Sequence, residues 1–98
     1  MRFQMSPHAA RQAEVRRITP REIAEIVEER MAAFDDAVAK TESFAILCGY
    51  TEDRGSLVGS NGDEVWAVLR EATITTVMLR RGNQPKTPAA LRVNKVVC

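Results

Sequence analysis

Two segments rich in strand-forming residues lie so close together that they can pair only as a tight hairpin. Residues 64–70 and 73–81 are dense in Val, Trp, Ile and Thr, and only Glu71 and Ala72 separate them. β-Branched and aromatic side chains favour strands, and a two-residue connection joins antiparallel neighbours. We therefore expect an antiparallel hairpin. Its turn requires positive φ at both central residues, which alanine tolerates poorly.

Both faces of this hairpin are apolar. Side chains alternate between the two faces of a strand, so one face is expected to hold Trp66, Val68, Thr75, Val77 and Leu79. The other face is expected to hold Val65, Ala67, Leu69, Ile74, Thr76 and Met78. Helices can cover one of these faces. The second then needs the tail 89–98, a second copy of the chain or another partner as its cover.

The N-terminal half carries the signals of two helices. Serine followed by proline at 6–7 predicts a short helix over about 7–16, because serine caps helix ends and proline suits the first turn. Thr19 and Glu22 have the spacing of a capping box, in which each side chain satisfies the backbone N–H of the other residue. Apolar residues at helical spacing follow, so we expect a second helix over 19–34.

These elements predict an α+β fold, with two N-terminal helices packed on a curved antiparallel sheet of three to five strands. Further strands are expected at 2–5, 43–50 and 91–97. The length of 98 residues suits a single domain, 1–98. We expect its core to span about 2–81, with a C-terminal tail, 82–98, that packs on the sheet or on a partner.

Composition narrows the functional classes. No apolar run approaches the roughly 20 residues of a membrane span, and the N-terminus lacks the apolar stretch of a signal peptide. We therefore expect a cytoplasmic protein without a membrane partner. Cys48 and Cys98 are too few for a disulfide framework, and Cys48 suits a buried structural thiol better than a nucleophile. No phosphate-loop, dinucleotide or zinc motif occurs, so no metal and no cofactor is expected.

The C-terminal third is basic. Residues 65–98 hold six Arg and Lys residues against a single acid, Glu71, whereas the whole chain has a net charge of +1. A basic surface attracts a phosphate backbone. The alternative is a solvated, arginine-rich surface without a nucleic-acid partner.

The first predicted helix holds the groups needed for RNA cleavage. His8 is the only histidine, and the positive end of a helix favours the neutral imidazole, which can act as a base. Arg11, Arg16 and Arg17 follow it. Attack by a 2′-hydroxyl needs a base, an acid and cations for the developing charge. The alternative is a histidine with a structural or surface role only.

Two stretches resemble a family of short uncharacterised domains that is grouped with the RelE/ParE-like toxin superfamily. The first stretch reads His8-Ala9, then Arg16-Arg17-Ile18-Thr19, and then the capped helix. The second is the hairpin, which contains a Thr76-Val77 pair. The resemblance spans about residues 3–81. It departs from the family at Arg17, where glycine is common, and at Glu71-Ala72, where Asp-Gly is usual.

The resemblance implies a RelE-like fold and a set of catalytic positions. These are His8, Arg16, Thr76 and Arg80. We expect nucleic-acid contacts from four further arginines: Arg11, Arg17, Arg70 and Arg81. The roles implied are an acid–base group for His8, phosphate stabilisers for Arg16 and Arg80, and a hydrogen-bonding positioner for Thr76.

Two functional hypotheses follow. The first is a toxin-type domain of a toxin–antitoxin pair that acts on RNA or the ribosome, with metal-independent ribonuclease activity if it is an enzyme. The second is a non-catalytic binding module, such as a phage or mobile-element accessory protein that docks on a host protein. A cognate antitoxin and a homodimer built through the sheet are partners compatible with these hypotheses.

Overall fold

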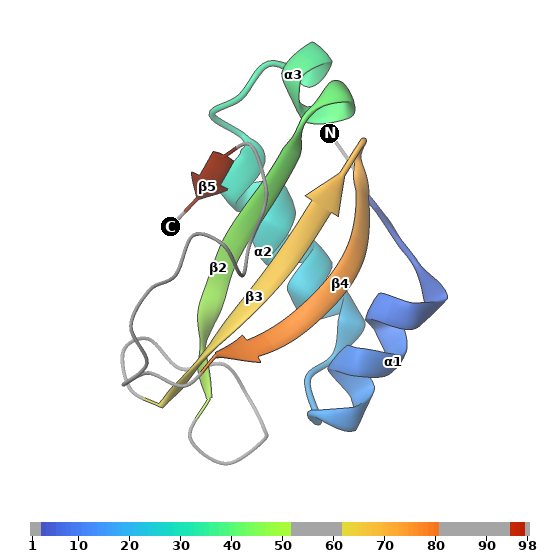
Figure 1. Ribbon diagram of the computed structural model, residues 1–98, viewed down its shortest axis with the longest axis vertical. Helices are drawn as coiled ribbons and strands as arrows, with labels where there is room; N and C mark the ends of the chain where they lie inside the picture. The colour runs from blue at the N-terminus through green and yellow to red at the C-terminus, as the bar shows by residue number, and fades with distance from the viewer. Residues whose placement is uncertain (1–2, 52–61, 81–94, 98) are drawn as a thin grey trace.

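The computed structural model describes residues 3–51, 62–80 and 95–97, which form three helices and a five-stranded sheet (Figure 1). The elements in chain order are β1 (Gln4–Met5), α1 (Pro7–Val15), α2 (Pro20–Met31), α3 (Asp36–Thr41), β2 (Ser43–Thr51), β3 (Asp63–Arg70), β4 (Thr73–Arg80) and β5 (Lys95–Val97). The predicted α+β class is confirmed. The third helix, α3, was not predicted as a separate element. It is separate from α2 because the chain turns between the end of α2 and Asp36.

The sheet is mixed rather than antiparallel throughout, and its strand order is β1-β4-β3-β2-β5. The three central strands pair antiparallel, as predicted. The two edge strands pair parallel, β1 with β4 and β5 with β2. The prediction of a purely antiparallel sheet is therefore wrong at both edges, where segments distant in sequence return beside the central strands in the same direction.

The helix starts agree with the sequence signals in position and differ in one hydrogen bond. Ser6 caps α1, because its Oγ accepts a hydrogen bond from the N–H of Ala9 at 3.1 Å. Thr19 occupies the N-cap position of α2 but makes no side-chain capping bond, so the predicted capping box is wrong. The first turn of α2 instead relies on Pro20, whose missing N–H needs no partner.

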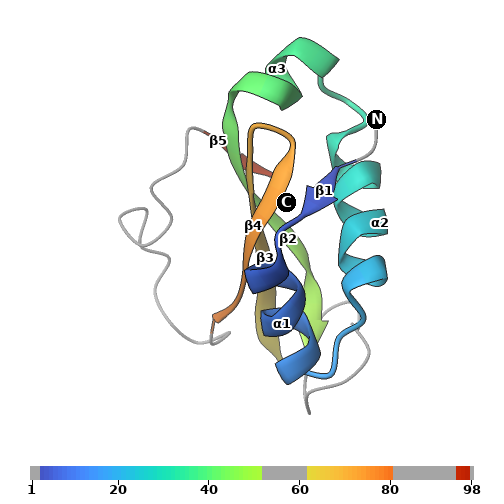
Figure 2. The same ribbon diagram turned by 90° about the vertical axis from the view of Figure 1, so that its right-hand side faces the viewer.

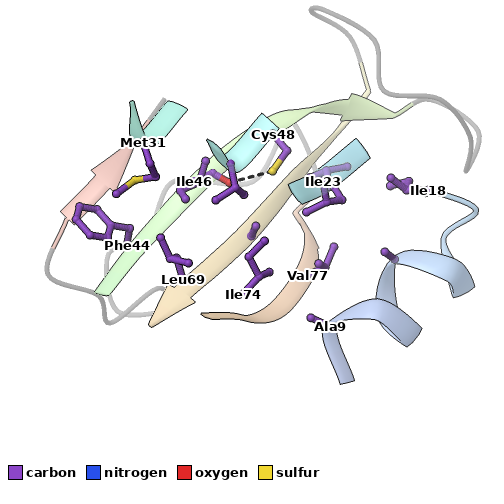
Figure 3. Close-up of a cluster of buried hydrophobic side chains, with 14 of the residues drawn as sticks. Ala9, Ile18, Ile23, Met31, Phe44, Ile46, Cys48, Leu69, Ile74 and Val77 are labelled. Atoms are coloured by element: carbon purple, nitrogen blue, oxygen red, sulfur yellow. Dashed lines mark hydrogen bonds between the residues drawn. The ribbon is translucent and has the colours of Figure 1, made fainter. Parts of the chain in front are cut away.

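The core lies between the helices and one face of the sheet. In Figure 2, α1 and α2 stand on the same side of the strands. Figure 3 shows the side chains that meet there, which include Ile23 and Met31 from α2, Phe44 and Ile46 from β2, and Leu69 from β3. These five side chains are at most 3% exposed. The helical spacing in α2 and the alternation in the strands direct them to this one layer.

The hairpin turn has the backbone geometry expected from its length. Glu71 and Ala72 have φ values of 48° and 64°, so both adopt the left-handed conformation that glycine usually supplies. The Ala72 carbonyl accepts a hydrogen bond from the Gln4 N–H at 3.1 Å. β1 thus holds this turn from outside the hairpin.

A β-bulge next to the turn changes which side chains share a face. Leu69 pairs with Ile74, but Val68 pairs with Thr76, so Thr75 is an extra residue in β4. From Thr76 onward every side chain of β4 is therefore displaced by one position. The predicted face assignment is wrong for Val77 and its neighbours in β4: Val77 lies in the helix-side core, and Met78 lies opposite Trp66 on the other face.

The sheet face opposite the helices is also buried. Ala45, Trp66 and Val68 are 0%, 2% and 7% exposed. Of the tail that was expected to cover this face, the structure describes residues 95–97, which pair with the edge of β2 as β5. The rest of that prediction concerns residues outside the described ranges.

Glycine is expected to stabilise the chain at two of its left-handed positions. Arg17 has a φ of 59° and Ala72 a φ of 64°, and a left-handed L-residue costs roughly 1–2 kcal/mol, partly offset by the greater unfolded-state entropy of glycine. Arg17→Gly and Ala72→Gly should each raise the free energy of unfolding by about 1 kcal/mol in urea titrations. Ala10→Gly, inside α1, is the control and should lower it by about 0.5–1 kcal/mol. Equal losses at all three positions would contradict the assigned backbone.

Candidate functional site

Helix α1 presents an exposed stripe on its outer surface that combines polar side chains with one apolar side chain. His8 and Arg11 are both exposed, and Val15, which follows at the same side of the helix, is 72% exposed. The opposite side of α1 is buried through Ala9 and Ala13. The small alanines let the helix approach the sheet closely. The His8 imidazole and the Arg11 guanidinium lie on the other side of the helix, in solvent.

Gln12 fixes α1 to the edge of the sheet. Its Oε1 accepts a hydrogen bond from the backbone N–H of Val77 at 2.8 Å, just after the bulge in β4. Arg16, half-buried at the end of the helix, donates from Nη1 to the Gln12 carbonyl at 3.0 Å. Its Nε atom is buried and makes no hydrogen bond with the described residues. Gln12 was not expected from the sequence to have this role, although a glutamine beside the small alanines of a helix is a usable signal.

Arg17 forms the corner between α1 and α2. Its left-handed backbone ends α1, with its N–H bonded to the Glu14 carbonyl at 2.9 Å and the Ile18 N–H bonded to the Ala13 carbonyl at 2.9 Å. The side chain of Arg17 is exposed. Glycine would adopt this left-handed backbone at a lower energetic cost than arginine. The arginine at this position places a cation at the corner, next to the outer surface of α1.

Thr76 and Arg80 lie on the sheet face that points away from the helices. Thr76 is half-buried opposite Val68. Arg80 lies opposite Glu64, with its Nε 3.9 Å from Glu64 Oε1, and the two side chains are only 11% and 10% exposed. The indole N–H of Trp66 donates to the same Glu64 oxygen at 3.4 Å.

Glu64 is the residue in this group that sequence reasoning missed. The unbroken register expected from the sequence would place Leu79 opposite Glu64, whereas the bulge places Arg80 there. A buried carboxylate beside a guanidinium neutralises a charge that would otherwise be costly to bury. Arg80 is therefore engaged by Glu64 within the protein.

The four residues predicted to be catalytic fall into two groups. His8 and Arg16 are eight residues apart on α1, a rise of roughly 12 Å along the axis. Thr76 and Arg80 are four residues apart on β4, roughly 13 Å along the strand. Of the predicted nucleic-acid contacts, Arg11, Arg17 and Arg70 are exposed, and Arg81 lies outside the described residues. The structure therefore does not bring the four predicted catalytic residues together, because one pair belongs to α1 and the other lies on the sheet face that points away from the helices.

Cys48 is a structural thiol, as the sequence indicated. It is 5% exposed, and its Sγ lies 3.7 Å from the Ile46 carbonyl oxygen (Figure 3). Desolvation by burial raises the pKa of the thiol from 9.0 to about 12, although the Arg30 charge and a hydrogen bond with the Ala67 backbone act in the opposite direction. The thiol therefore stays protonated at neutral pH and is a poor nucleophile.

This raised pKa predicts a loss of stability in alkali. Between pH 9 and 12 the unfolded chain releases the Cys48 proton while the folded chain keeps it. The unfolded state then binds fewer protons, so the free energy of unfolding falls as pH rises, by up to about 1.4 kcal/mol per pH unit. Urea titrations across this range should show a shallower decline for Cys48→Ala than for the wild type. Parallel declines would contradict the assignment.

A hollow of about 310 Å³ opens near the C-terminal end of α2. Its lining includes the apolar side chains of Phe3, Met31, Phe34 and Ala39 and the carboxylates of Glu28 and Asp36. The C-terminal end of α2 and helix α3, which contribute most of its lining, lie at the opposite end of the molecule from α1 in both ribbon views (Figures 1 and 2). The sequence offered no sign of it, because its residues come from α2, α3, the turn between them and the N-terminal segment.

Three further observations bear on function. Within residues 3–51, 62–80 and 95–97, no group of three or more His, Cys, Asp and Glu side chains could hold a metal ion. No helix in the same residues has both the length and the apolar character required to cross a bilayer. Comparison of the chain with protein-family models, with curated proteins and with solved structures gives no match.

Proposed function

We propose that this chain is an RNA-binding domain of the RelE-like toxin type, acting in the cytoplasm, with α1 and its corner as the RNA contact surface. The observation that supports this most is the exposure of His8, Arg11 and Arg17 along α1 and the turn after it. Residues 7–17, which span α1 and this corner, contain three arginines and one glutamate, a net charge of +2 with His8 neutral. A surface of this kind attracts the phosphates of an extended strand.

Within this proposal the two groups of residues have different roles. Arg11 and Arg17 contact phosphates, and His8 is the group available for acid–base chemistry on a 2′-hydroxyl. Gln12 holds α1 against β4, and Arg16 donates to the Gln12 carbonyl at the end of the helix. Arg80 acts through its pairing with Glu64 and keeps the sheet in register.

RNA binding is tested by fluorescence polarisation with a labelled single-stranded oligoribonucleotide over a series of salt concentrations. Each lost phosphate contact should reduce the slope of log K against log salt by about 0.7. Arg11→Ala and Arg17→Gly should both weaken binding in this way. Arg17→Gly is informative because the same change is expected to stabilise the fold. Lys40→Ala, which removes an exposed cation from α3, is the matched control and should bind like the wild type.

Cleavage is tested separately with the same RNA in the presence of a chelator. If the domain is a metal-independent ribonuclease, the wild type degrades the RNA and His8→Ala does not, while both bind it. RNA that is bound but left intact by the wild type reduces the proposal to binding alone. Absence of RNA binding even at low salt would overturn the proposal and favour the protein-docking hypothesis.

A further inference from the structure

The hollow near the end of α2 combines an apolar floor with a preorganised aromatic ring. Met31 and Ala39 are 3% and 2% exposed at its base. Phe34 is half-buried, and its ring packs edge-on against Phe44, with centroids 5.1 Å apart and an interplanar angle of 62°. Phe3 contributes a second half-buried ring. The volume of about 310 Å³ suits one long side chain and is too small for a helix or a strand.

The carboxylates at the hollow have no partner among the residues that the structure describes. Glu28 and Asp36 line it, and neither makes a hydrogen bond or ion pair with another described residue. Over residues 28–36 there are four acids and one arginine, a net charge of −3. This field repels phosphates and attracts cations. The hollow is therefore complementary to a group that is both apolar along its length and cationic at its end.

We propose that the hollow receives an arginine side chain from a partner polypeptide. The methylene stem of arginine covers apolar surface while its head stays polar. The planar guanidinium stacks on aromatic rings and forms paired hydrogen bonds with carboxylates, which the compact ammonium of lysine does less well. Phe34 and Phe3 supply the rings, and Glu28 and Asp36 supply the carboxylates.

This site is independent of the proposed RNA surface. α1 and α3 lie at opposite ends of the molecule in both ribbon views (Figures 1 and 2). The two ends also differ in charge, because residues 7–17 carry +2 and residues 28–36 carry −3. An arginine-bearing polypeptide can thus occupy one end while the other stays open to a polyanion, and either proposal can fail without the other.

A blocked tetrapeptide that contains one arginine is titrated into the full chain, and its binding is measured through the backbone amide shifts in NMR spectra. The same peptide with citrulline in place of arginine keeps the shape and removes the charge. We expect the arginine peptide to shift the amides of residues 28–39 and the citrulline peptide to bind at least about tenfold more weakly, a difference of about 1.4 kcal/mol.

The double variant Glu28→Gln and Asp36→Asn should weaken the arginine peptide by a similar factor. Its control is the double variant Glu14→Gln and Asp63→Asn, which removes the same charge from residues outside the hollow and outside residues 28–36 and should bind normally. Near-isosteric changes at the surface leave the fold intact, which the melting temperatures verify. Equal binding of the citrulline peptide, unchanged binding by Glu28→Gln and Asp36→Asn, or shifts confined to other residues would each overturn the proposal.

Discussion

Replacing Phe44 with alanine should lower the free energy of unfolding by about 3–5 kcal/mol, the range found for large aromatic truncations in protein cores. Phe44 is fully buried in β2, where it packs against the Phe34 ring. Truncation removes apolar burial and leaves a cavity between the sheet and the chain that follows α2. A small domain has only about 5–15 kcal/mol of stability, so this variant should be partly unfolded under mild conditions.

Urea unfolding followed by circular dichroism measures this loss. Phe44→Leu is the matched control, because it keeps most of the apolar volume and should lose clearly less than the alanine variant. The loss of the Phe44 ring also frees Phe34, so the hollow near α2 should bind its arginine peptide more weakly in Phe44→Leu even where the fold persists. A loss below about 1 kcal/mol for Phe44→Ala would contradict the central position assigned to this ring.

Replacing Trp66 with alanine should have an effect of similar size, about 3–5 kcal/mol, on the opposite face of the sheet. Trp66 is 2% exposed, and its indole N–H donates to Glu64, which also lies against Arg80. The substitution removes the largest side chain of that face. It also removes a hydrogen-bond donor from the Glu64 carboxylate, which is only 10% exposed. The loss of this hydrogen bond lowers the free energy of unfolding in addition to the effect of the cavity.

Trp66→Phe separates these two contributions, because it keeps an aromatic ring and removes only the N–H. It should lose less than Trp66→Ala in urea titrations followed by circular dichroism. The wild-type fluorescence spectrum provides an independent check, since Trp66 is the only tryptophan and a buried indole emits at shorter wavelengths than an exposed one. Emission typical of water-exposed indole, together with a small loss for Trp66→Ala, would show that this face is open in solution.

The sequence correctly predicted several structural features that depend on a local signal. Ser6-Pro7 predicted the start of α1, and the Glu71-Ala72 connection predicted a two-residue turn with both residues at positive φ. Periodicity identified the buried side of α2. These features depend on residues within a few positions of one another, so composition and spacing are enough.

The bulge at Thr75 shows where local signals fail. The Ser6 hydroxyl donates to the Thr75 carbonyl at 3.3 Å, and Gln12 accepts from the Val77 N–H. Both contacts come from the start of the chain, more than sixty residues away. Within the hairpin, the Thr75 hydroxyl also donates to the Val68 carbonyl at 3.4 Å, so the position of the extra residue depends on contacts both inside and outside the hairpin. One inserted position moves Val77 into the core and brings Arg80 opposite Glu64. The candidate site is affected too, because the surroundings of Thr76 and Arg80 follow from this register.

The parallel strands at the two margins of the sheet have a consequence for the order in which the protein assembles. β3 and β4 meet through a two-residue turn, whereas β1 must find β4, and β5 must find β2, across most of the chain. Closing a long loop costs conformational entropy before the new contacts compensate for that cost. The central strands β2, β3 and β4 should therefore pair first, and the edge strands β1 and β5 should join last. The same difference between the central strands and the edge strands determines which hydrogen bonds of the sheet open first. Amide protons should exchange earliest from the first and last strands and latest from β3, which is paired along nearly its whole length on both sides.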